Sequence, residues 1–360
     1  MNFRELLKDD IFKLPLIQKE KVTFKVFIFK ILKEFEDKVN LLDDELIDPN
    51  KNIKTSFVKK TLKDNIKNLN QSILEYLNGN PHKAYEYLEK TLKGNFKDLT
   101  EIFKNKNYVL DESFFRIRTN DTNYPYSIDQ MLHIPFEHRG KVSTQRYSIP
   151  GFPSLYLGKT IYICWEELRR PSIDKIQIIR LKNINTLKIL DLTPPIKDCS
   201  DIDELYKFLM TFPLIMCCSV KVKNDHDTFK PEYIIPQLLL QWIRNNSEFD
   251  GIQYKSTHIT TNSFIENSEL TNIVLPVKSN SNKGLCKKLI NKFESTEVVS
   301  WSLYQFATGG QNFMYNSNEF DKINKRIPNL ELINGVQLPY SYSTLGNLEY
   351  YLENLKTKSI

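Results

Sequence analysis

The chain lacks the sequence features of secreted and membrane-spanning proteins. Its five cysteines are scattered over 360 residues without a Cys-x-x-Cys pair, so reduced thiols are favoured over a disulfide framework. Charged residues interrupt every apolar stretch before it reaches the roughly 20 residues that a membrane helix needs. The first residues, MNFRELLKDD, lack the apolar core of a secretory signal. We therefore expect a cytoplasmic protein with no membrane segment.

Several common catalytic motifs are absent as well. The sequence contains no Walker A loop, GxGxxG, HExxH or GxSxG motif. His133 and His138 are five residues apart, a poor helical spacing for metal ligands, so surface or hydrogen-bonded roles are favoured. The net charge of +6 comes from 50 basic and 44 acidic residues, a near balance that argues only weakly for nucleic acid. We expect no metal, no bound cofactor and no nucleic-acid partner.

The spacing of the apolar residues along the chain changes near residue 108. Before that point apolar residues recur at helical spacing in segments separated by DPNKN and NGNP, which predicts an all-helical N-terminal region. Short β-type runs follow, namely SFFRIR, SLYLG, KIQIIRLK, LKILDL, GIQYKS and NIVLPV. Helical patterns alternate with these runs at 161–170, about 202–211, 236–244 and 345–356. The fold class is therefore α+β.

The stretch RYSIPGFPSLYLGKTIYICWEEL, residues 146–168, differs from the rest of the chain. Thr160 is a plausible N-cap for a helix that stops before Pro171. On this helix Glu166 has Arg169 and Arg170 three and four residues ahead, which predicts a solvated ion pair on the outer face. Glu167 shares a face with Ile163 and Cys164, which predicts that it points inward. Glu167 is therefore the better candidate for a site.

A second candidate stretch, FDGIQYKSTH, places an Asp-Gly turn before a strand. On a regular strand Ile252, Tyr254 and Ser256 point to one face, which fits a pocket wall but equally fits a cross-strand polar pair. His258 follows and has two interpretations, a site residue or the commoner structural histidine. Cys217 and Cys218, in the apolar run FPLIMCCSV, are expected to be buried thiols.

These pieces together resemble the RES family, named for Arg, Glu and Ser. The resemblance rests on the order of FFRIR, HIPFEHRGKVSTQRYSIPGFPSLYLG, CWEEL, and DGIQYKS before NIVLPV, and covers roughly residues 112–278. It departs from the family where Tyr147-Ser148 stands in place of Trp-Asn and where Ser256 lies far along the chain. By this resemblance, the functional residues of the family correspond in this chain to Arg116 (with Arg118 as the alternative), Arg146, Tyr156, Glu167 and Ser256.

The resemblance implies an ADP-ribosyltransferase-like RES domain with central β-sheets and flanking helices. We expect a helical domain over 1–108, a RES-like catalytic domain over 109–280, and a C-terminal α/β extension of that domain over 281–360. Known RES proteins degrade NAD+, and many are toxins with a neutralising protein partner. The resemblance therefore implies a toxin that uses NAD+ as a substrate and that a neutralising or regulatory protein can bind.

The residues fit this chemistry. Cleavage of the nicotinamide–ribosyl bond passes through a cationic transition state with a neutral leaving group, so it requires neither a metal nor a strong acid. Arginines would bind the pyrophosphate, Tyr147, Tyr156 and Tyr254 would pack against nicotinamide and ribose, and Glu167 would stabilise the developing positive charge. We expect a glycohydrolase or phosphorylase. Two alternatives are an ADP-ribosyltransferase that modifies a macromolecule and an inactive NAD-binding or protein-interaction module whose N-terminal region docks a partner.

Overall fold

The structure is a computed structural model of the chain, divided by its internal contacts into two compact units. The residues that it describes are 1–94, 99–122, 124–195, 199–257, 270–308, 324, 326–327, 330–333 and 336–360. Unit 1 comprises Met1–Lys106, Thr144–Ser148 and Leu190–Glu248. Unit 2 comprises Asn107–Ser143, Ile149–Ile189 and Phe249–Ile360. Each unit is therefore built from three separate stretches of sequence.

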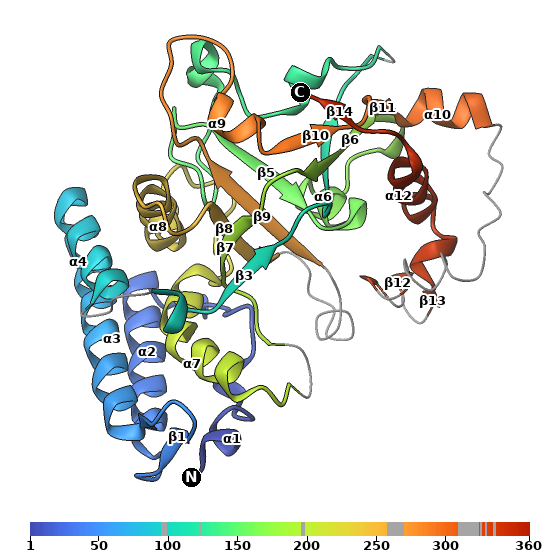
Figure 1. Cartoon of the computed structure of the whole chain (residues 1–360). Coiled ribbons are helices and arrows are strands. Elements are labelled where there is room, and N and C mark those ends of the chain that lie inside the picture. The colour runs from blue at the N-terminus through green and yellow to red at the C-terminus, as the bar shows by residue number, and fades with distance from the viewer. Residues whose placement is uncertain are drawn as a thin grey trace. The chain divides into compact units, whose positions relative to one another are not determined.

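Unit 1 is mostly helical. Helix α3 packs against both α2 and α4 (Figure 1), and each of the three helices buries one stripe of apolar side chains, as their helical periodicity predicts. The helices of this unit are α1 Phe3–Leu6, α2 Phe24–Asn40, α3 Thr55–Leu77, α4 Pro81–Lys93, α7 Ile202–Cys218 and α8 Ile234–Asn245. Strands β1 Leu46–Asp48 and β2 Ile53–Lys54 form a short antiparallel pair between α2 and α3.

Helix α7 is buried along most of its length and contacts α2, α3 and α8 of unit 1. It was expected over about 202–211 but continues through Pro213 to Cys218, and almost all of its second half is buried. Phe208 and Phe212 of α7 pack against the rings of Phe12 and Phe35 from the N-terminal part of the chain. The expectation that Cys217 and Cys218 are buried thiols is confirmed. Helix α7 therefore depends on the N-terminal helices for its cover.

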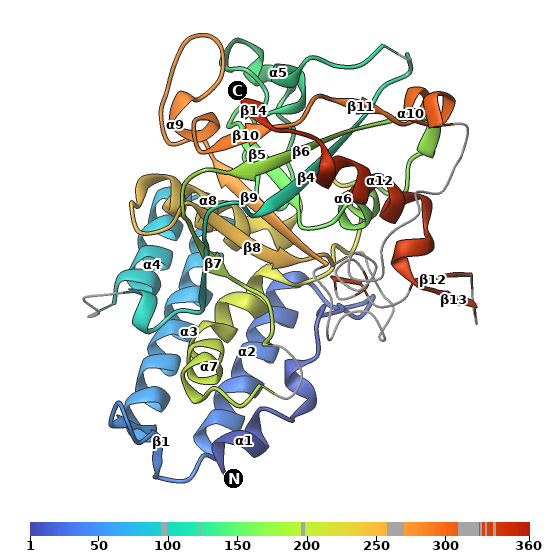
Figure 2. The same cartoon turned by 45° about the vertical axis from the view of Figure 1, so that its right-hand side comes forward.

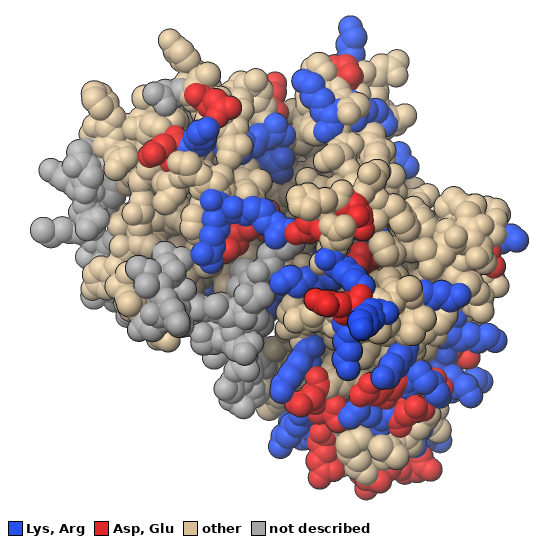
Figure 3. All heavy atoms as spheres, turned by 180° about the vertical axis from the view of Figure 1, so that it is seen from behind, with Lys and Arg blue, Asp and Glu red and all other residues tan. Residues whose placement is uncertain are grey.

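The surface charges of the molecule are interleaved. Figure 3 shows lysine and arginine side chains next to aspartate and glutamate side chains over one face. Many of them form ion pairs along a helix, such as Lys33 with Asp37 at 2.9 Å and Lys93 with Glu89 at 2.8 Å. Such exposed pairs keep a helix face in water and contribute little to stability.

Unit 2 contains most of a ten-stranded sheet, visible in Figure 2. Its order is β14-β10-β6-β4-β5-β9-β8-β7-β3, with β11 also paired to β6. The strands are β3 Asn105–Tyr108, β4 Ser113–Thr119, β5 Ser154–Gly158, β6 Ile176–Asn183, β7 Leu187–Asp191, β8 Gly251–Lys255, β9 Thr271–Pro276, β10 Phe293–Ser295, β11 Val299–Ser300 and β14 Lys358–Ser359. Six of them fall within one or two residues of the β-type runs expected from the sequence.

Two apolar clusters lie on the two faces of this sheet. Strand alternation directs Phe115 and Ile117 of β4 into one cluster with α6, and Phe114 into the other. The remaining elements of unit 2 are α5 Ile128–Met131, α6 Ile161–Glu167, α9 Lys287–Ile290, α10 Trp301–Thr308, α12 Thr344–Asn354 and the hairpin β12 Leu330–Ile333 with β13 Val336–Leu338. Helix α12 packs directly on α6 (Figure 2), so the C-terminal part of the chain covers the segment expected to carry the site.

The predicted α+β fold class is confirmed by these helices and sheets. The three sequential domains expected from the sequence stay a prediction, and the compact units follow other bounds. Residues 190–248, expected within the second domain, cluster with the N-terminal helices because α7 and α8 bury their apolar faces there. Among the helices that the structure describes, none combines the length and apolar character needed to cross a membrane.

Candidate active site

Strands β4 and β5 meet at one residue pair and then separate. Their register contains only Phe115 opposite Gly158, whereas β4 pairs with β6 along its whole length. Arg116 follows Phe115, and its Nη1 donates to the main-chain oxygen of Tyr156 at 2.7 Å. A Cβ atom on Gly158 would lie 2.5 Å from Cys164 Sγ, so glycine is required for α6 to approach the sheet this closely. The guanidinium of Arg116 therefore bridges the two strands where their pairing ends.

Arg116 and Arg118 share one face of β4 and carry charge without a carboxylate partner among the described residues. Arg118 Nη2 donates to the main-chain oxygen of Leu132 at 2.9 Å. The Nε atom of Arg116 is buried and has no hydrogen-bond partner among the residues that the structure describes. Burial lowers the pKa of Arg116 to about 9, with a further lowering by Arg118, and burial also lowers the pKa of Arg118. An anion would relieve this unfavourable environment.

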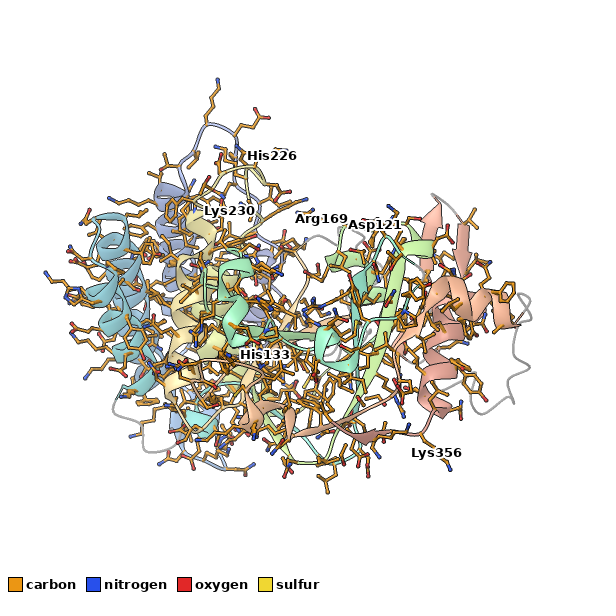
Figure 4. The ribbon with its side chains drawn as sticks, turned by 90° about the horizontal axis from the view of Figure 1, so that it is seen from above. Asp121, His133, Arg169, His226, Lys230 and Lys356 are labelled. Carbon is orange, nitrogen blue, oxygen red and sulfur yellow. The ribbon has the colours of Figure 1, made fainter. Side chains whose placement is uncertain are left out.

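His133, labelled in Figure 4, lies close enough to both arginines for their charge to reach it. Its Nε2 accepts the main-chain N–H of Cys286 at 2.8 Å, so Nδ1 carries the proton and donates to the main-chain oxygen of Ile134 at 2.8 Å. Burial lowers the pKa of His133, and Arg116 and Arg118 lower it further. The histidine is therefore neutral and structural, as favoured from the sequence.

Helix α6 begins and ends on identifiable interactions. The Thr160 hydroxyl accepts the N–H of Ile163 at 3.2 Å, which confirms the predicted N-cap. The helix ends earlier than expected, at Glu167. Arg169, labelled in Figure 4, and Arg170 adopt positive φ angles of 63° and 54°. Their N–H groups bond to the carbonyls of Glu166 at 2.9 Å and Trp165 at 3.0 Å, which is a Schellman motif with arginine in place of the usual glycine.

The expectation that Glu166 lies in solvent is wrong. The side chain is 7% exposed and binds Arg170 bidentately, with Nε–Oε2 and Nη2–Oε1 distances of 2.9 and 2.8 Å. The Tyr162 hydroxyl also hydrogen-bonds to it. The predicted ion pair with Arg170 is therefore present, but α6 is so short and so closely covered that even its outer glutamate is buried.

Glu167 is half-buried and is held against the sheet. Its Oε1 accepts a hydrogen bond from Nδ2 of Asn272 at 2.9 Å. Asn272 lies on β9 between Gly158 on β5 and Tyr254 on β8. Sequence reasoning missed Asn272, although a polar residue at the start of the apolar run NIVLPV was a signal that could have found it. The structure thus joins Glu167 to the strands that carry the other candidate residues.

The charges of Arg116 and Glu167 act on the same buried thiol. Burial raises the pKa of Cys164 to about 12, while Arg116 lowers it and Glu167 raises it. Cys164 Sγ donates to the main-chain oxygen of Phe115 at 3.2 Å and is therefore fixed between the sheet and α6. A cationic and an anionic side chain thus flank Cys164, within electrostatic range of one another.

Tyr156 and Tyr254 belong to the face of the sheet on which α6 packs. Tyr156 is two residues from Gly158, and Tyr254 is paired with Asn272, so strand alternation directs all of them to that face. Arg116 and Arg118 alternate along β4 with Phe115 and Ile117, so their side chains leave the strand toward the opposite face of the sheet. Ser256, 8% exposed, directly follows β8. His258 lies outside the described residues.

Arg146 and Tyr147 belong to unit 1, whereas the other candidate residues belong to unit 2. Arg146 is 9% exposed, its Nη1 donates to the main-chain oxygen of Cys218 at 2.9 Å, and its guanidinium lies 5.2 Å from the centre of the Tyr233 ring. Tyr147 is fully buried. These contacts hold the loop 144–148 against α7 and α8, so the part of these two residues in substrate binding stays a prediction.

Comparison with known proteins supports the RES assignment. Residues 114–279 match the model of the RES family, described as the RES domain. This stretch contains β4, β5, α6, β8 and β9, which carry the candidate residues. The resemblance to the RES family read from the sequence is therefore confirmed over residues 114–279.

A curated relative extends this similarity beyond the RES domain. The chain is similar to a Bacillus subtilis (strain 168) protein named "Putative toxin YopC", with 37% identity over 257 residues. The aligned region covers 66% of this chain and 55% of the relative, so the chain spans about half the length of that protein. No solved structure matched the chain significantly.

Proposed function

We propose that this chain is a toxin-like enzyme whose RES domain cleaves the nicotinamide–ribosyl bond of NAD+. The observation that carries the proposal is the uncompensated charge of Arg116 and Arg118. Each guanidinium has five N–H donors but donates one hydrogen bond among the described residues, to a main-chain carbonyl. Donors that are partly desolvated and lack a carboxylate favour a phosphate-bearing ligand.

Glu167 supplies the second requirement of the reaction. As the bond between ribose and nicotinamide breaks, positive charge develops on the ribose while nicotinamide departs with the bonding electron pair. Glu167, oriented by Asn272, would stabilise that charge. Water then adds to the ribose carbon and loses a proton, which gives ADP-ribose and nicotinamide, whereas phosphate in place of water gives ADP-ribose 1″-phosphate. Tyr156 and Tyr254 would support the rings of the substrate on the face that carries Asn272 and Glu167. The pyrophosphate would lie where β4 and β5 separate, because Arg116 reaches the main chain of Tyr156 there from the opposite face.

The test is a product analysis with purified protein. NAD+ is incubated with and without phosphate, and the products are identified by mass. Nicotinamide with ADP-ribose supports hydrolysis, ADP-ribose 1″-phosphate supports phosphorolysis, and a protein that gains ADP-ribose indicates transfer. Intact NAD+ under every condition contradicts the proposal. In bacteria that express the chain, growth should stop as the NAD+ pool falls, and arrest with an intact pool would exclude NAD+ depletion as the cause.

A further inference from the structure

Glu349 of α12 is a carboxylate with no exposed surface, and it lies beyond the part of the chain that matches the RES model. Its Oε2 accepts hydrogen bonds from the main-chain N–H of Ile161 at 2.8 Å and from the Tyr340 hydroxyl at 2.9 Å. Its Oε1 accepts from Nη1 of Arg326 at 3.0 Å. A buried charge with three donors is a specific arrangement, because a buried carboxylate without partners would be strongly destabilising.

One of these donors belongs to the helix of the candidate active site. Ile161 is the first residue of α6, and the first N–H groups of a helix have no partner within it. Thr160 binds the N–H of Ile163, and Glu349 binds that of Ile161 across 188 positions of sequence. The partial positive charge at a helix N-terminus favours a carboxylate there. The start of α6 is therefore fixed by a local cap and a distant one.

Helix α6 depends on this support because it has only seven residues. A helix of that length is unstable alone, and tertiary contacts must hold it in place. Leu345, Leu348 and Leu352 of α12 pack in the same cluster as Ile161 and Ile163. Glu349 adds a directional bond to this apolar contact. Glu167 lies at the other end of α6, less than two turns away, so a displacement at Ile161 moves its carboxylate.

We propose that Glu349 is a positioning residue: by holding the start of α6 it places Glu167 against Asn272 and thereby sets the rate of substrate cleavage. The effect on rate rests on the proposed function, whereas the effect on α6 does not. Removal of the carboxylate is expected to lower turnover rather than substrate affinity, since Glu349 contacts the helix and not the phosphate-binding arginines. Small displacements of a catalytic group cost up to about 10²-fold in rate.

The environment of Glu349 should make both turnover and stability depend on pH. Burial raises its pKa to about 7, Arg326 and the Ile161 and Tyr340 donors oppose this, and Glu353 one turn ahead adds to it. Two other titratable groups face it, the Tyr340 hydroxyl and the Cys164 thiol, and burial raises the pKa of both. The carboxylate is therefore protonated below about pH 7 and becomes a strong acceptor for Ile161 only above it.

The sign of this dependence differs between stability and turnover. A carboxyl with a raised pKa binds a proton in the folded chain between about 4.5 and about 7, where the unfolded chain has lost it. Its contribution to stability therefore falls as the pH rises through this window. Turnover should rise over the same range, because the ionised carboxylate holds α6 more firmly. Opposite trends in the two measurements distinguish positioning from a general structural role.

The experiment compares Glu349→Ala and Glu349→Gln with Glu353→Gln in the full chain. Glu353 is the matched control, because it lies one turn away and binds the same Arg326 at 2.5 Å, whereas among the described residues no hydrogen bond joins its carboxylate to α6. Hydrogen exchange of the peptide 159–168 is measured together with kcat and KM for NAD+ between pH 5.5 and 8.5. We expect Glu349→Ala to exchange faster in this peptide and to lose roughly 10- to 10²-fold in kcat at nearly unchanged KM. Glu349→Gln should retain most of kcat at low pH but lose the rise near pH 7. Glu353→Gln should match the wild type in kcat at pH 8.5 and in the exchange of α6, and should only move the rise to a lower pH, because Glu353 adds to the raised pKa of Glu349.

Two results would overturn the proposal. One is a folded Glu349→Ala variant with wild-type exchange in α6 and wild-type kcat. The other, which applies even if Glu349→Ala does not fold, is a Glu349→Gln variant that keeps the rise in kcat near pH 7. If the wild type leaves NAD+ intact, the proposed function fails by itself, and the exchange of α6 in the Glu349 variants still decides whether Glu349 holds the helix.

Discussion

The two units of the molecule contain buried positive charge in different forms. In unit 1, Lys104 is 6% exposed, and its Nζ lies 2.5 Å from Oδ2 of the equally buried Asp191. In unit 2, the buried Lys159 also has a carboxylate partner, with Nζ 2.8 Å from Oε2 of the more exposed Glu112. Arg116 and Arg118 have no carboxylate partner among the described residues. The comparison teaches that both units pair a buried lysine with a carboxylate, whereas Arg116 and Arg118 at the candidate site have only main-chain partners among the described residues.

Arg180 shows that the absence of a carboxylate partner does not by itself indicate an arginine that binds a ligand. It donates to the main-chain oxygens of Glu353 at 2.9 Å and Leu355 at 2.8 Å, at the C-terminal end of α12. The partial negative charge of a helix C-terminus compensates a cation there. Arg116 donates to a carbonyl within strand β5, and Arg118 donates to Leu132, the C-cap of α5, which has only four residues and therefore a much smaller dipole than α12. Their charge is therefore the more available to a ligand.

Deletion of residues 1–107 should have the largest effect on stability, because it removes the N-terminal helices that cover the rest of unit 1. In the shortened chain α7 loses the Phe12 and Phe35 rings that cover it. We expect an aggregated or protease-sensitive product with exposed apolar surface. Limited proteolysis and gel filtration test this, and a monomeric, protease-resistant truncated chain would contradict it.

Lys104→Ala should destabilise the protein by about 3–5 kcal/mol, because it leaves Asp191 buried without its cation. Urea unfolding followed by fluorescence measures the loss, and KM for NAD+ should not change in the remaining folded protein. Lys93→Ala is the control. Its pair with Glu89 is exposed, so no measurable change is expected. Equal effects of the two substitutions would show that burial of the Lys104 pair does not matter.

Glu167→Gln should lower turnover by roughly 10²–10³-fold, equivalent to about 2.7–4 kcal/mol, while the melting temperature changes little. The amide keeps the shape and can still bind Asn272, but it lacks the charge. Glu166→Gln should behave in the opposite way, with a lower melting temperature because the buried bidentate pair with Arg170 is lost. A nicotinamide-release assay and a melting curve for each variant suffice. An inactive Glu166→Gln with an active Glu167→Gln would reverse the assignment.

Arg116→Lys should weaken NAD+ binding by about one to two decades, or roughly 1.5–3 kcal/mol, because a lysine offers no bidentate fork to phosphate. Stability should be retained, since a partly desolvated cation without a counter-charge is replaced by a more flexible one. Arg139→Lys in the same unit, whose side chain donates to Asn280, is the control. Unchanged affinity in Arg116→Lys would leave Arg118 as the phosphate-binding residue.

The smallest effect is expected at the end of α6. Arg169→Gly should stabilise the protein by about 1 kcal/mol, because its φ of 63° is unfavourable for any residue with a Cβ atom. Arg170→Gly relieves a similar angle but loses the pair with Glu166, so it should destabilise the protein. Thermal unfolding of both variants separates backbone strain from the ion pair. A destabilised Arg169→Gly would mean that its side chain contributes more than the strain costs.

The elements of this fold follow closely from local pattern. Strand β5 has the bounds expected for SLYLG, and α3 and α4 follow the helical periodicity of their segments to within a residue or two. The end of α6 could not be predicted, because a helix that stops at Glu167 requires two arginines in the left-handed region, which local propensity disfavours. Helix α7 also departs from local propensity, because it continues through Pro213, a residue that normally ends or kinks a helix.

The sequence by itself determined the α+β class, the RES resemblance, the cap at Thr160 and the identity of the charged and aromatic candidates. These depend on periodicity and short-range chemistry, which neighbouring residues encode. Only the tertiary structure decided that Glu166 is buried, that Asn272 holds Glu167, that Arg146 belongs to unit 1 and that Glu349 caps α6 from 188 positions away. Burial and long-range hydrogen bonds depend on which surfaces meet, and no local pattern in a single sequence records that.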